Sequence, residues 1–536
     1  MLLSKPDPIR VALNRITFGA RTSDVDYANS IGWSTWVTEQ LNSVENNDPA
    51  LGAHLMRQTM LIRYGAPAAN DTRGTWTAVD EMRPLNYIYA DTPTLWKITR
   101  NAGGSVSFSE RTRIRQELAA ATWIRNAHGR YQIREFMADF WHNHFNIGKN
   151  ENELATALLP VFDLAAIRTN SLGNFRTLLG ATAHQGAMLI YLDNWVSSAA
   201  TPNENYAREI MELHTLGGEA YLGAVSNPAL VGKDANGVNV GFTDQDVIQA
   251  SRILSGMTIK YGQTGDNNVA QPDTGEYVFN SRQHNTTATN ILGVSLAGIN
   301  NGSMQGERFL DIIATHPATA KFIVTKLARR IFGDTPPQAV IDRGILAWKI
   351  NQSSPEQIAT VLRAILIDGE EIKTAPVIKV RRPYERVIAL ARTTGMVVNA
   401  GTTMTSMLDP FNDGLFAWQA PNGRPDTNDY WLATGSTIAT WNILFQIPTL
   451  AEFASTPLST QTPLEVLNSA NGVVEYWVGS MVGYQLNETA MNSLVADQGG
   501  ANGIPAAVRT NNATRIETAH RRLVSLIATS EEFTLR

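Results

Sequence analysis

Residues 130–145 read RYQIREFMADFWHNHF, and this stretch decides the fold class. Its apolar side chains recur with the i, i+3, i+4, i+7 spacing of an amphipathic helix. His144 falls on the apolar stripe, whereas His142 lies on the polar face with Glu135 and Asp139. We therefore expect a core helix here. The residues of the stripe are Ile133, Phe136, Met137, Phe140, Trp141 and Phe145.

Helix signals continue after this stretch. Thr201 is expected to cap a helix that has Glu204 as its capping-box partner and stops at Gly217. Another helix should begin at Pro317 and stop at Gly333. Further helices are predicted near 175–192, 243–256, 356–368 and 515–534.

Two segments break the helical pattern. Residues 257–304 contain Gly, Asn and Thr around two short β-like runs, which predict a small hairpin. Residues 399–436 are rich in Pro, Gly and aromatic side chains, and predict a long ordered loop packed on the protein body. The expected fold is mainly α, with one large multi-helix core. Because 536 residues exceed the usual size of a single core, the unit over 1–536 can also consist of two packed lobes, about 1–255 and 305–536, joined by 257–304.

Composition excludes several classes of site. There is no cysteine, so disulfides, zinc–thiolate sites, haem–thiolate and iron–sulfur centres are ruled out. No phosphate-binding glycine loop, serine nucleophile elbow or His-Glu-x-x-His sequence is present, and no nucleotide site is expected. The net charge of −5 gives no general attraction for nucleic acid. Local basic clusters are expected to be solvated helix faces or ion pairs; they include Arg111, Arg113 and Arg115, and Lys379, Arg381 and Arg382.

No window approaches the roughly 20 apolar residues that a membrane helix needs, so we expect a chain that is not embedded in a membrane. The first residues, MLLSKPDP, show no signal peptide. The location is therefore left open between the cytoplasm and an exported form without its leader.

Nine short stretches along the chain are informative by their sequence and by their order. They are LNRITFG (13–19), FWHNHF (140–145), MLIYLDN (188–194), ENYARE (204–209), FTD (242–244), HPATA (316–320), KLARR (326–330), PNG (421–423) and SEEF (530–533). In number and order these phrases resemble the bacterial family called domain of unknown function 1800, from one end of the chain to the other.

The resemblance implies a mostly helical fold and a bacterial origin. It also implies export to the periplasm or the exterior, and a sulfatase-like neighbour protein as a partner. Two departures from the family pattern bear on chemistry. The chain has Asn285 and Thr289 where the family commonly has an aspartate and a lysine, and Gln185-Gly186-Ala187 where it tends to have Pro-Ala after the histidine.

A metal or polar site is the most suggestive candidate for chemistry. His144 could combine with Glu209 and Glu212, which share one helix face, because imidazole and carboxylate groups of facing helices can hold a divalent metal. We favour a purely structural role for these residues over a metal site. Arg208 can form i, i+4 ion pairs, and a histidine on an apolar stripe is usually a hydrogen-bonded core residue. Further ligands could come from His184, Asp193 or His214.

Two other candidates concern ligands without a metal. Arg208 could bind a carboxylate or sulfate, or could anchor its helix to a neighbour. The aromatic residues Trp418 and Trp431, with Phe411 and Phe416, could line a sugar-binding groove or fill an interface between lobes.

Two functional hypotheses follow. The favoured one is a non-catalytic exported protein that binds or scaffolds a polysaccharide or protein partner, because no complete catalytic motif is present. The alternative is a metal-assisted enzyme with a His/Glu site in the helical core.

Overall fold

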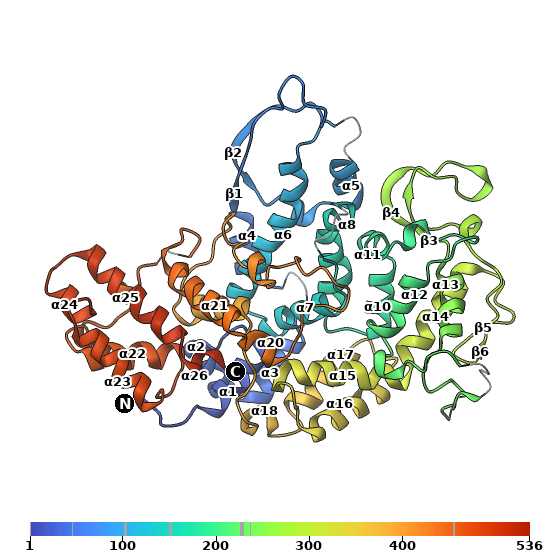
Figure 1. Ribbon diagram of the computed structural model, residues 1–536. Coiled ribbons are helices and arrows are strands. Elements are labelled where there is room, and N and C mark those ends of the chain that lie inside the picture. The colour runs from blue at the N-terminus through green and yellow to red at the C-terminus, as the bar shows by residue number, and fades with distance from the viewer. Residues whose placement is uncertain are drawn as a thin grey trace.

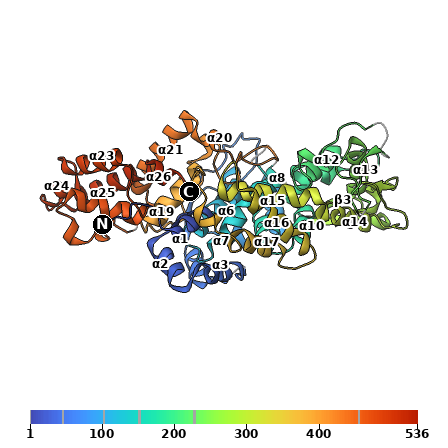
Figure 2. The ribbon, with the colours of Figure 1, turned by 90° about the horizontal axis from the view of Figure 1, so that it is seen from below.

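The computed structural model describes residues 2–44, 47–100, 104–148, 153–225, 230–235, 237–453 and 456–536, with the side chain of residue 267 left aside. Helices dominate this part of the chain, which confirms the prediction of a mainly α protein. The molecule is elongated in both ribbon views (Figures 1 and 2).

The first part of the chain supplies one end of the core and a hairpin. Its elements are α1 (Pro8–Ile16), α2 (Thr22–Ile31), α3 (Trp33–Leu41), α4 (Pro49–Met56), β1 (Thr59–Tyr64), β2 (Val79–Pro84), η1 (Tyr87–Tyr89), α5 (Thr92–Arg100), α6 (Phe108–His128) and α7 (Gln132–His144). The β1–β2 hairpin stands out at the top of Figure 1. It is antiparallel, with Thr59 opposite Pro84 and Tyr64 opposite Val79. We did not predict this hairpin, because β2 is mostly exposed and lacks the alternation of a half-buried strand.

The middle of the chain adds most of the remaining helices. They are α8 (Glu153–Ala157), α9 (Leu159–Val161), the π-helix η2 (Phe162–Arg168), α10 (Phe175–Ala183), α11 (Gly186–Tyr191), η3 (Asn194–Val196), α12 (Glu204–Glu212), η4 (Gly218–Ala220), α13 (Asp244–Leu254), α14 (Gly302–Thr315), α15 (Pro317–Phe332), α16 (Gln338–Ile350), α17 (Gln357–Leu366), α18 (Glu371–Thr374) and α19 (Pro383–Thr393).

The predicted β-like excursion lies between α13 and α14. Strands β3 (Met257–Tyr261) and β4 (Asp273–Phe279) pair antiparallel with Met257 opposite Phe279, and the register shifts between Ile259 and Tyr261. The short pair β5 (Asn290–Ile291) and β6 (Val294–Ser295) follows. These strands lie at one end of the elongated molecule (Figure 2).

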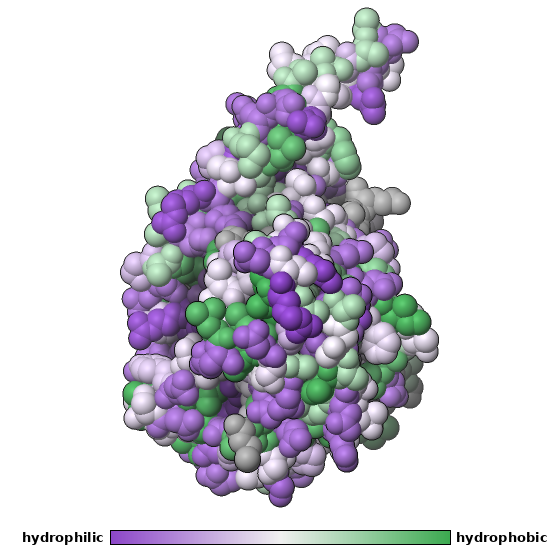
Figure 3. Space-filling view, turned by 90° about the vertical axis from the view of Figure 1, so that its left-hand side faces the viewer, coloured by the Kyte–Doolittle hydropathy of each residue, from purple (hydrophilic) through white to green (hydrophobic). Residues whose placement is uncertain are grey.

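The last part of the chain forms the other end. It contains α20 (Asn428–Leu432), α21 (Thr434–Gln446), α22 (Ala470–Met481), α23 (Glu488–Gly499), α24 (Ile504–Val508), α25 (Ala513–Ala528) and α26 (Glu531–Thr534). The helix predicted over 515–534 is therefore two helices. On the face shown in Figure 3, hydrophobic patches are small and separated by hydrophilic side chains.

Local sequence explains several helix ends. Thr243 caps α13 with Asp246 as its capping-box partner, and Gly333 ends α15, both near the predicted positions. The predicted cap Thr201 is wrong. The cap of α12 is Asn203, whose side chain accepts the backbone N–H of Tyr206, so the helix begins two residues later than expected.

One connected cluster of buried apolar side chains runs from Ala12 to Phe533. Helix α6 packs against α19, and α1 packs against both α7 and α15, so distant parts of the chain share this core. The division into two lobes stays a prediction. Among the described residues, no helix combines the length and apolar character needed to cross a membrane.

Candidate functional site

The loop of residues 411–426, which we call the covering loop, is hydrogen-bonded to the end of α7. The side-chain amide of Asn143 donates to the carbonyl oxygen of Arg424 at 3.1 Å, and its oxygen accepts the Arg424 backbone N–H at 2.8 Å. Asn146 donates to the carbonyl oxygen of Trp418 at 3.1 Å. The loop therefore packs against the body, as the sequence predicted, and lies beside the polar face of α7.

A narrow polar cavity, the histidine cavity, lies between α7 and the covering loop. Its volume is about 20 Å³, room for roughly one water molecule. His142 stands in its wall and donates from Nε2 to Oδ1 of Asp163 at 2.8 Å. The lining residues are Thr122, Asn126, Glu135, Ala138, Asp139, His142, Asn146, Ile147, Arg168, Leu415, Phe416, Trp418 and Arg424.

The π-helix η2 positions Asp163. The wider turn of a π-helix stacks residues five apart, and Arg168, five positions later, donates from Nε to Oδ2 of Asp163 at 2.9 Å. Arg125 adds a contact at 3.4 Å. Burial alone would raise the pKa of this carboxyl, but Arg168, His142 and Arg125 hold it well below its usual range. Asp163 is therefore a permanently charged partner for His142.

A second cavity, the arginine cavity, adjoins the first. Asp139 and Arg424 line both cavities. The volume of the second is about 10 Å³, again close to one water molecule. Its full lining is Asp139, Phe140, Asn143, Lys326, Arg330, Arg382, Arg424, Pro425 and Asp426.

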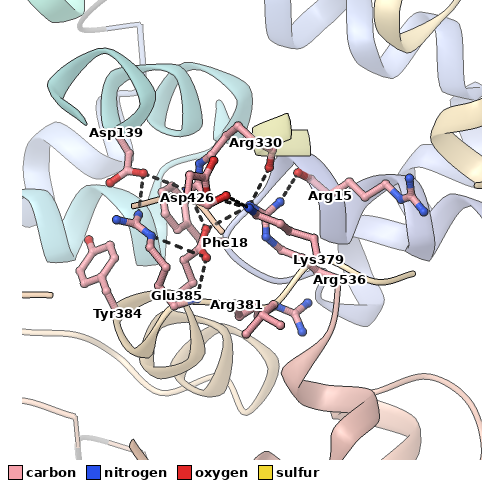
Figure 4. Close-up of polar contacts among 12 residues, drawn as sticks. Arg15, Phe18, Asp139, Arg330, Lys379, Arg381, Tyr384, Glu385, Asp426 and Arg536 are labelled. Atoms are coloured by element: carbon pink, nitrogen blue, oxygen red, sulfur yellow. Dashed lines mark hydrogen bonds and ion pairs between the residues drawn. The ribbon is translucent and has the colours of Figure 1, made fainter. Parts of the chain in front are cut away.

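Behind the arginine cavity lies a network of buried charges (Figure 4). Oδ2 of Asp139 accepts from Arg330 at 2.9 Å and from Arg382 at 2.8 Å. Arg330 also pairs with Glu385 at 2.6 Å. Burial alone would raise the pKa of Asp139. The combined effect of the three arginines around it is larger and lowers this pKa below its usual value, so the carboxylate stays charged.

The network draws on segments that are far apart in the sequence. Lys379 pairs with Asp426 of the covering loop at 2.7 Å. The guanidinium of Arg536 is buried and donates to the carbonyl oxygens of Arg15 and Arg330. Helices α1, α7, α15 and α19 and the end of the chain thus meet at one centre, as Figure 4 shows.

Lys326 reaches the arginine cavity from α15 and contacts His144. The Lys326 ammonium lies 3.2 Å from Nδ1 of His144, and Nε2 of His144 lies 3.0 Å from the carbonyl oxygen of His214. Since a carbonyl only accepts, Nε2 carries the proton and Nδ1 accepts from the ammonium. Burial lowers the pKa of Lys326 to about 8, against a smaller raising effect of Asp426. Near pH 7 the side chain is therefore mostly cationic.

The lining of the arginine cavity has more positive than negative groups, and Glu385 and Asp413 behind the lining neutralise part of this excess. Four of its lining residues are cationic (Lys326, Arg330, Arg382, Arg424) and two are carboxylates (Asp139, Asp426). Within the described residues, no ion pair brings a carboxylate to within 4.0 Å of the Lys326 nitrogen; its polar contact is His144.

Three guanidinium nitrogens in this lining form no hydrogen bond within the described chain: Nη1 of Arg330, Nε of Arg382 and Nε of Arg424. Each faces a carboxylate at 3.8–3.9 Å, which is too far for a hydrogen bond. The cations of the cavity are thus incompletely paired.

The residues of the predicted metal site have different partners. Both nitrogens of His144 are engaged, as described above. His184 pairs with Glu307 at 3.0 Å and its ring packs on Tyr277. In the described chain, no group of three or more His, Asp or Glu side chains could hold a metal ion. The set His144, His184, Glu209 and Glu212 does not fit a metal, and a metal site stays a prediction without geometric support.

Glu209 and Glu212 of α12 are half-buried side chains. Burial and the neighbouring Glu212 raise the pKa of Glu209, with Arg208 opposing. Arg208 itself pairs with Asp244 at 3.2 Å and lies over the ring of Tyr221. Its side chain is 37% exposed, so this arginine joins α12 to α13 at the surface.

The two tryptophans of the aromatic segment differ in environment. Trp418 lines the histidine cavity, and its indole N–H has no hydrogen-bond partner within the described chain. Trp431 is 2% exposed and donates its N–H to the carbonyl oxygen of Pro425 at 2.8 Å. The structure therefore gives Trp418 a place in a cavity wall and Trp431 a packing role beside the covering loop.

Sequence reasoning missed most of the cavity residues. His142 was placed on the polar face with Glu135 and Asp139, and this face is buried against other charged groups. Lys379, Arg381 and Arg382 were expected to form a solvated helix face or ion pairs. The solvated face is wrong, because all three are 1–4% exposed. Ion pairs are present for Lys379 and Arg382, whereas Arg381 donates to the carbonyl oxygens of Phe533 and Leu535. The one sequence signal for these cavity residues was the polar face of α7, a helix whose other side chains are mostly apolar.

Comparison with known proteins confirms the family resemblance found in the sequence. The sequence profile of a family described as "Protein of unknown function (DUF1800)" matches residues 11–535. Neither a search of curated proteins nor a search of solved structures found a match.

Proposed function

The chain belongs to the DUF1800 family, whose description assigns no activity, and we propose that it is a binding protein whose ligand places an acidic group in the arginine cavity. The acidic group is a carboxylate, sulfate or phosphate carried by a polysaccharide or protein partner. Export of the chain, which the family resemblance implies, and a sulfatase-like partner stay predictions.

The observation that carries the proposal is the position of Lys326. Its ammonium stands in a cavity wall beside three guanidinium groups, with a neutral imidazole as its polar contact. A partly buried cation without a carboxylate within 4.0 Å is costly, because the protein replaces little of the lost hydration energy. A bound anion would provide the missing partner.

The three incompletely paired arginines also support binding of an anion in this cavity. Arginine binds carboxylate, sulfate and phosphate through two parallel N–H donors. The Arg424–Asp139 contact is long, at 3.7 Å, and the guanidinium of Arg424 donates to the carbonyl oxygen of Gly414 at 3.3 Å. An incoming anion therefore competes with one neutral acceptor and not with a hydrogen bond to Asp139.

The volume of the cavity sets a condition on binding. About 10 Å³ is too small for a sulfate group. Entry of the ligand therefore requires an outward shift of the covering loop, which carries Arg424, Pro425 and Asp426.

Titration with sulfate and with acetate tests the proposal. The full chain is titrated in low-salt buffer by calorimetry, with chloride at matched ionic strength as the reference. Lys326→Met keeps the apolar stem and removes the charge. We expect saturable binding to the wild type and a loss of affinity of roughly tenfold or more in Lys326→Met, since a charge-assisted hydrogen bond contributes about 1.5–3 kcal/mol.

Lys321→Met is the matched control. Lys321 lies on the same helix, is 67% exposed and pairs with Glu219 at the surface. Its removal should leave the affinity unchanged. Equal affinity of wild type and Lys326→Met, or no saturable binding to the wild type, would overturn the proposal.

A further inference from the structure

The histidine cavity has unused hydrogen-bonding capacity of both kinds. Oδ1 of Asn126 is a buried acceptor without a partner in the described chain, and the Trp418 indole N–H is a donor without one. Both residues line the cavity. Asn126 itself is 1% exposed, and its amide nitrogen donates to the hydroxyl of Tyr384 at 2.8 Å.

A group that both donates and accepts hydrogen bonds can satisfy both atoms together. A ligand hydroxyl is such a group, since it can donate to Asn126 and accept from Trp418, as a water molecule can. A buried polar atom left without a partner costs about 1–3 kcal/mol, so a ligand that displaces water from this cavity must supply a group of this kind. Carboxylates accept only and ammonium groups donate only, so neither can satisfy both.

The walls of the cavity have the mixed character of a carbohydrate site. Phe416 and Trp418 of the covering loop supply apolar ring surface, and the ring of His142 packs edge-on against Phe416 at 5.0 Å. Glu135 and Asp139 add carboxylate oxygens, which accept from hydroxyl groups. Binding sites of this kind combine aromatic surface with a few placed polar groups.

The two cavities adjoin through Asp139 and Arg424, which line both. A ligand that enters beneath the covering loop therefore meets the cationic lining on one side and the hydroxyl-binding pair on the other. We propose that the ligand is an acidic sugar unit, whose carboxylate occupies the arginine cavity and whose neighbouring hydroxyl occupies the histidine cavity between Asn126 and Trp418.

This inference rests on the proposed function and adds the chemical class of the ligand. The histidine cavity of about 20 Å³ accepts one hydroxyl-sized group in the present arrangement. The rest of the sugar ring would occupy space that residues 424–426 of the covering loop vacate, while Trp418 keeps its place in the wall of the histidine cavity.

Calorimetric titration with three small probes tests the inference on the full chain. D-Glucuronate carries the carboxylate and the hydroxyls, acetate carries the carboxylate alone, and D-glucose carries the hydroxyls alone. We expect glucuronate to bind roughly tenfold or more tightly than acetate, and glucose to bind more weakly than either. Equal affinity for glucuronate and acetate would overturn the inference and leave the proposed function standing. Absence of binding by glucuronate, acetate and sulfate alike would overturn both.

A pair of tryptophan variants locates the hydroxyl. Trp418→Phe keeps an aromatic ring and removes the indole N–H. It should reduce the preference for glucuronate over acetate and leave acetate affinity unchanged. Trp441→Phe is the matched control on α21, where the indole is 42% exposed, and it should change neither affinity. An unchanged preference in Trp418→Phe would refute the assignment of the hydroxyl to this residue. The comparison of probes on the wild type needs no variant and decides the ligand class if Trp418→Phe fails to fold.

Discussion

Gly423 of the covering loop lies directly against the backbone carbonyl oxygen of Asn143, so closely that a Cβ atom at Gly423 would overlap this oxygen. The backbone of Gly423 also has φ near +75°, in the left-handed region that side chains other than glycine's disfavour. At the Pro-Asn-Gly turn the backbone of the loop therefore lies in direct contact with the backbone of α7. Both cavities depend on this approach, because the residues around the turn form their shared wall.

Gly423→Ala should loosen the covering loop. The added methyl group meets backbone, which cannot move aside, and it also carries the cost of the left-handed conformation. We expect the free energy of unfolding to fall by about 1–3 kcal/mol, and the Trp418 emission to shift to longer wavelength. Urea unfolding followed by fluorescence measures both. The control is Gly435→Ala, where a Cβ meets nothing within 4 Å. Equal stability of the two variants would contradict the close approach.

Asp139→Asn should destabilise the protein strongly. The carboxylate neutralises Arg330 and Arg382 in a buried position, and removal of one partner of a buried pair leaves an uncompensated charge. The expected loss is about 3–5 kcal/mol in the free energy of unfolding. The matched control is Asp497→Asn, which removes a surface pair with Arg522 and should cost less than about 1 kcal/mol. Similar losses in the two variants would show that the Asp139 network contributes little.

Stability should fall as the pH is lowered from 6.5 towards 4. Burial, together with His54, Arg392 and Arg21, lowers the pKa of His128 from 6.5 to about 4, and burial lowers that of His214 to about 3. Between these values and 6.5 the unfolded chain binds protons that the folded chain does not, so acid favours unfolding. The His128 contribution reaches about 3 kcal/mol near pH 4.

The variant His128→Gln tests the assignment of this acid sensitivity. Nε2 of His128 accepts the backbone N–H of Val398 at 2.8 Å, and a glutamine oxygen can accept the same bond without titrating. Urea unfolding at pH 7.0, 6.0, 5.0 and 4.5 should show a shallower decline in the variant. Parallel declines in wild type and variant would assign the acid sensitivity to other groups. Asp163 and Glu385, whose pKa values are lowered, contribute below this pH range.

Elemental analysis tests the metal hypothesis. In the structure, Nε2 of His144 is protonated towards His214 and Nδ1 accepts from Lys326, so neither nitrogen has a lone pair free for a metal. We expect no stoichiometric divalent metal in protein purified without chelators. Near-stoichiometric metal that is lost in folded His144→Ala and Glu209→Ala would restore the enzyme hypothesis and require a different arrangement of these side chains.

The fold was predictable to the extent that local signals decide it. The apolar stripe of residues 133–145 fixes α7 because its spacing matches 3.6 residues per turn. The Thr243–Asp246 capping box fixes the start of α13. The prediction of Thr201 as the cap of α12 failed because asparagine caps a helix as well as threonine does, and the helix begins after Asn203.

The candidate site was less predictable, because its residues are brought together by tertiary contacts. Asp139, Arg330, Arg382 and Asp426 come from separate elements and approach one another only in the folded chain. On a single helix, the polar face with Glu135, Asp139 and His142 has the same pattern whether it meets water or buried arginines. The choice of His144 over His142 followed from its place on the apolar stripe, which indicates burial but not access to a cavity.

The buried guanidinium of Arg536 has a consequence for synthesis of the protein. Its contacts with Arg15, Arg330 and Glu385 close the charged centre, so this centre can close only after the chain has been synthesised as far as residue 536. A chain interrupted by a premature stop codon before residue 536 would keep Glu385 and the carbonyl groups of Arg15 and Arg330 without this partner. Such truncated products should be exposed to cellular proteases.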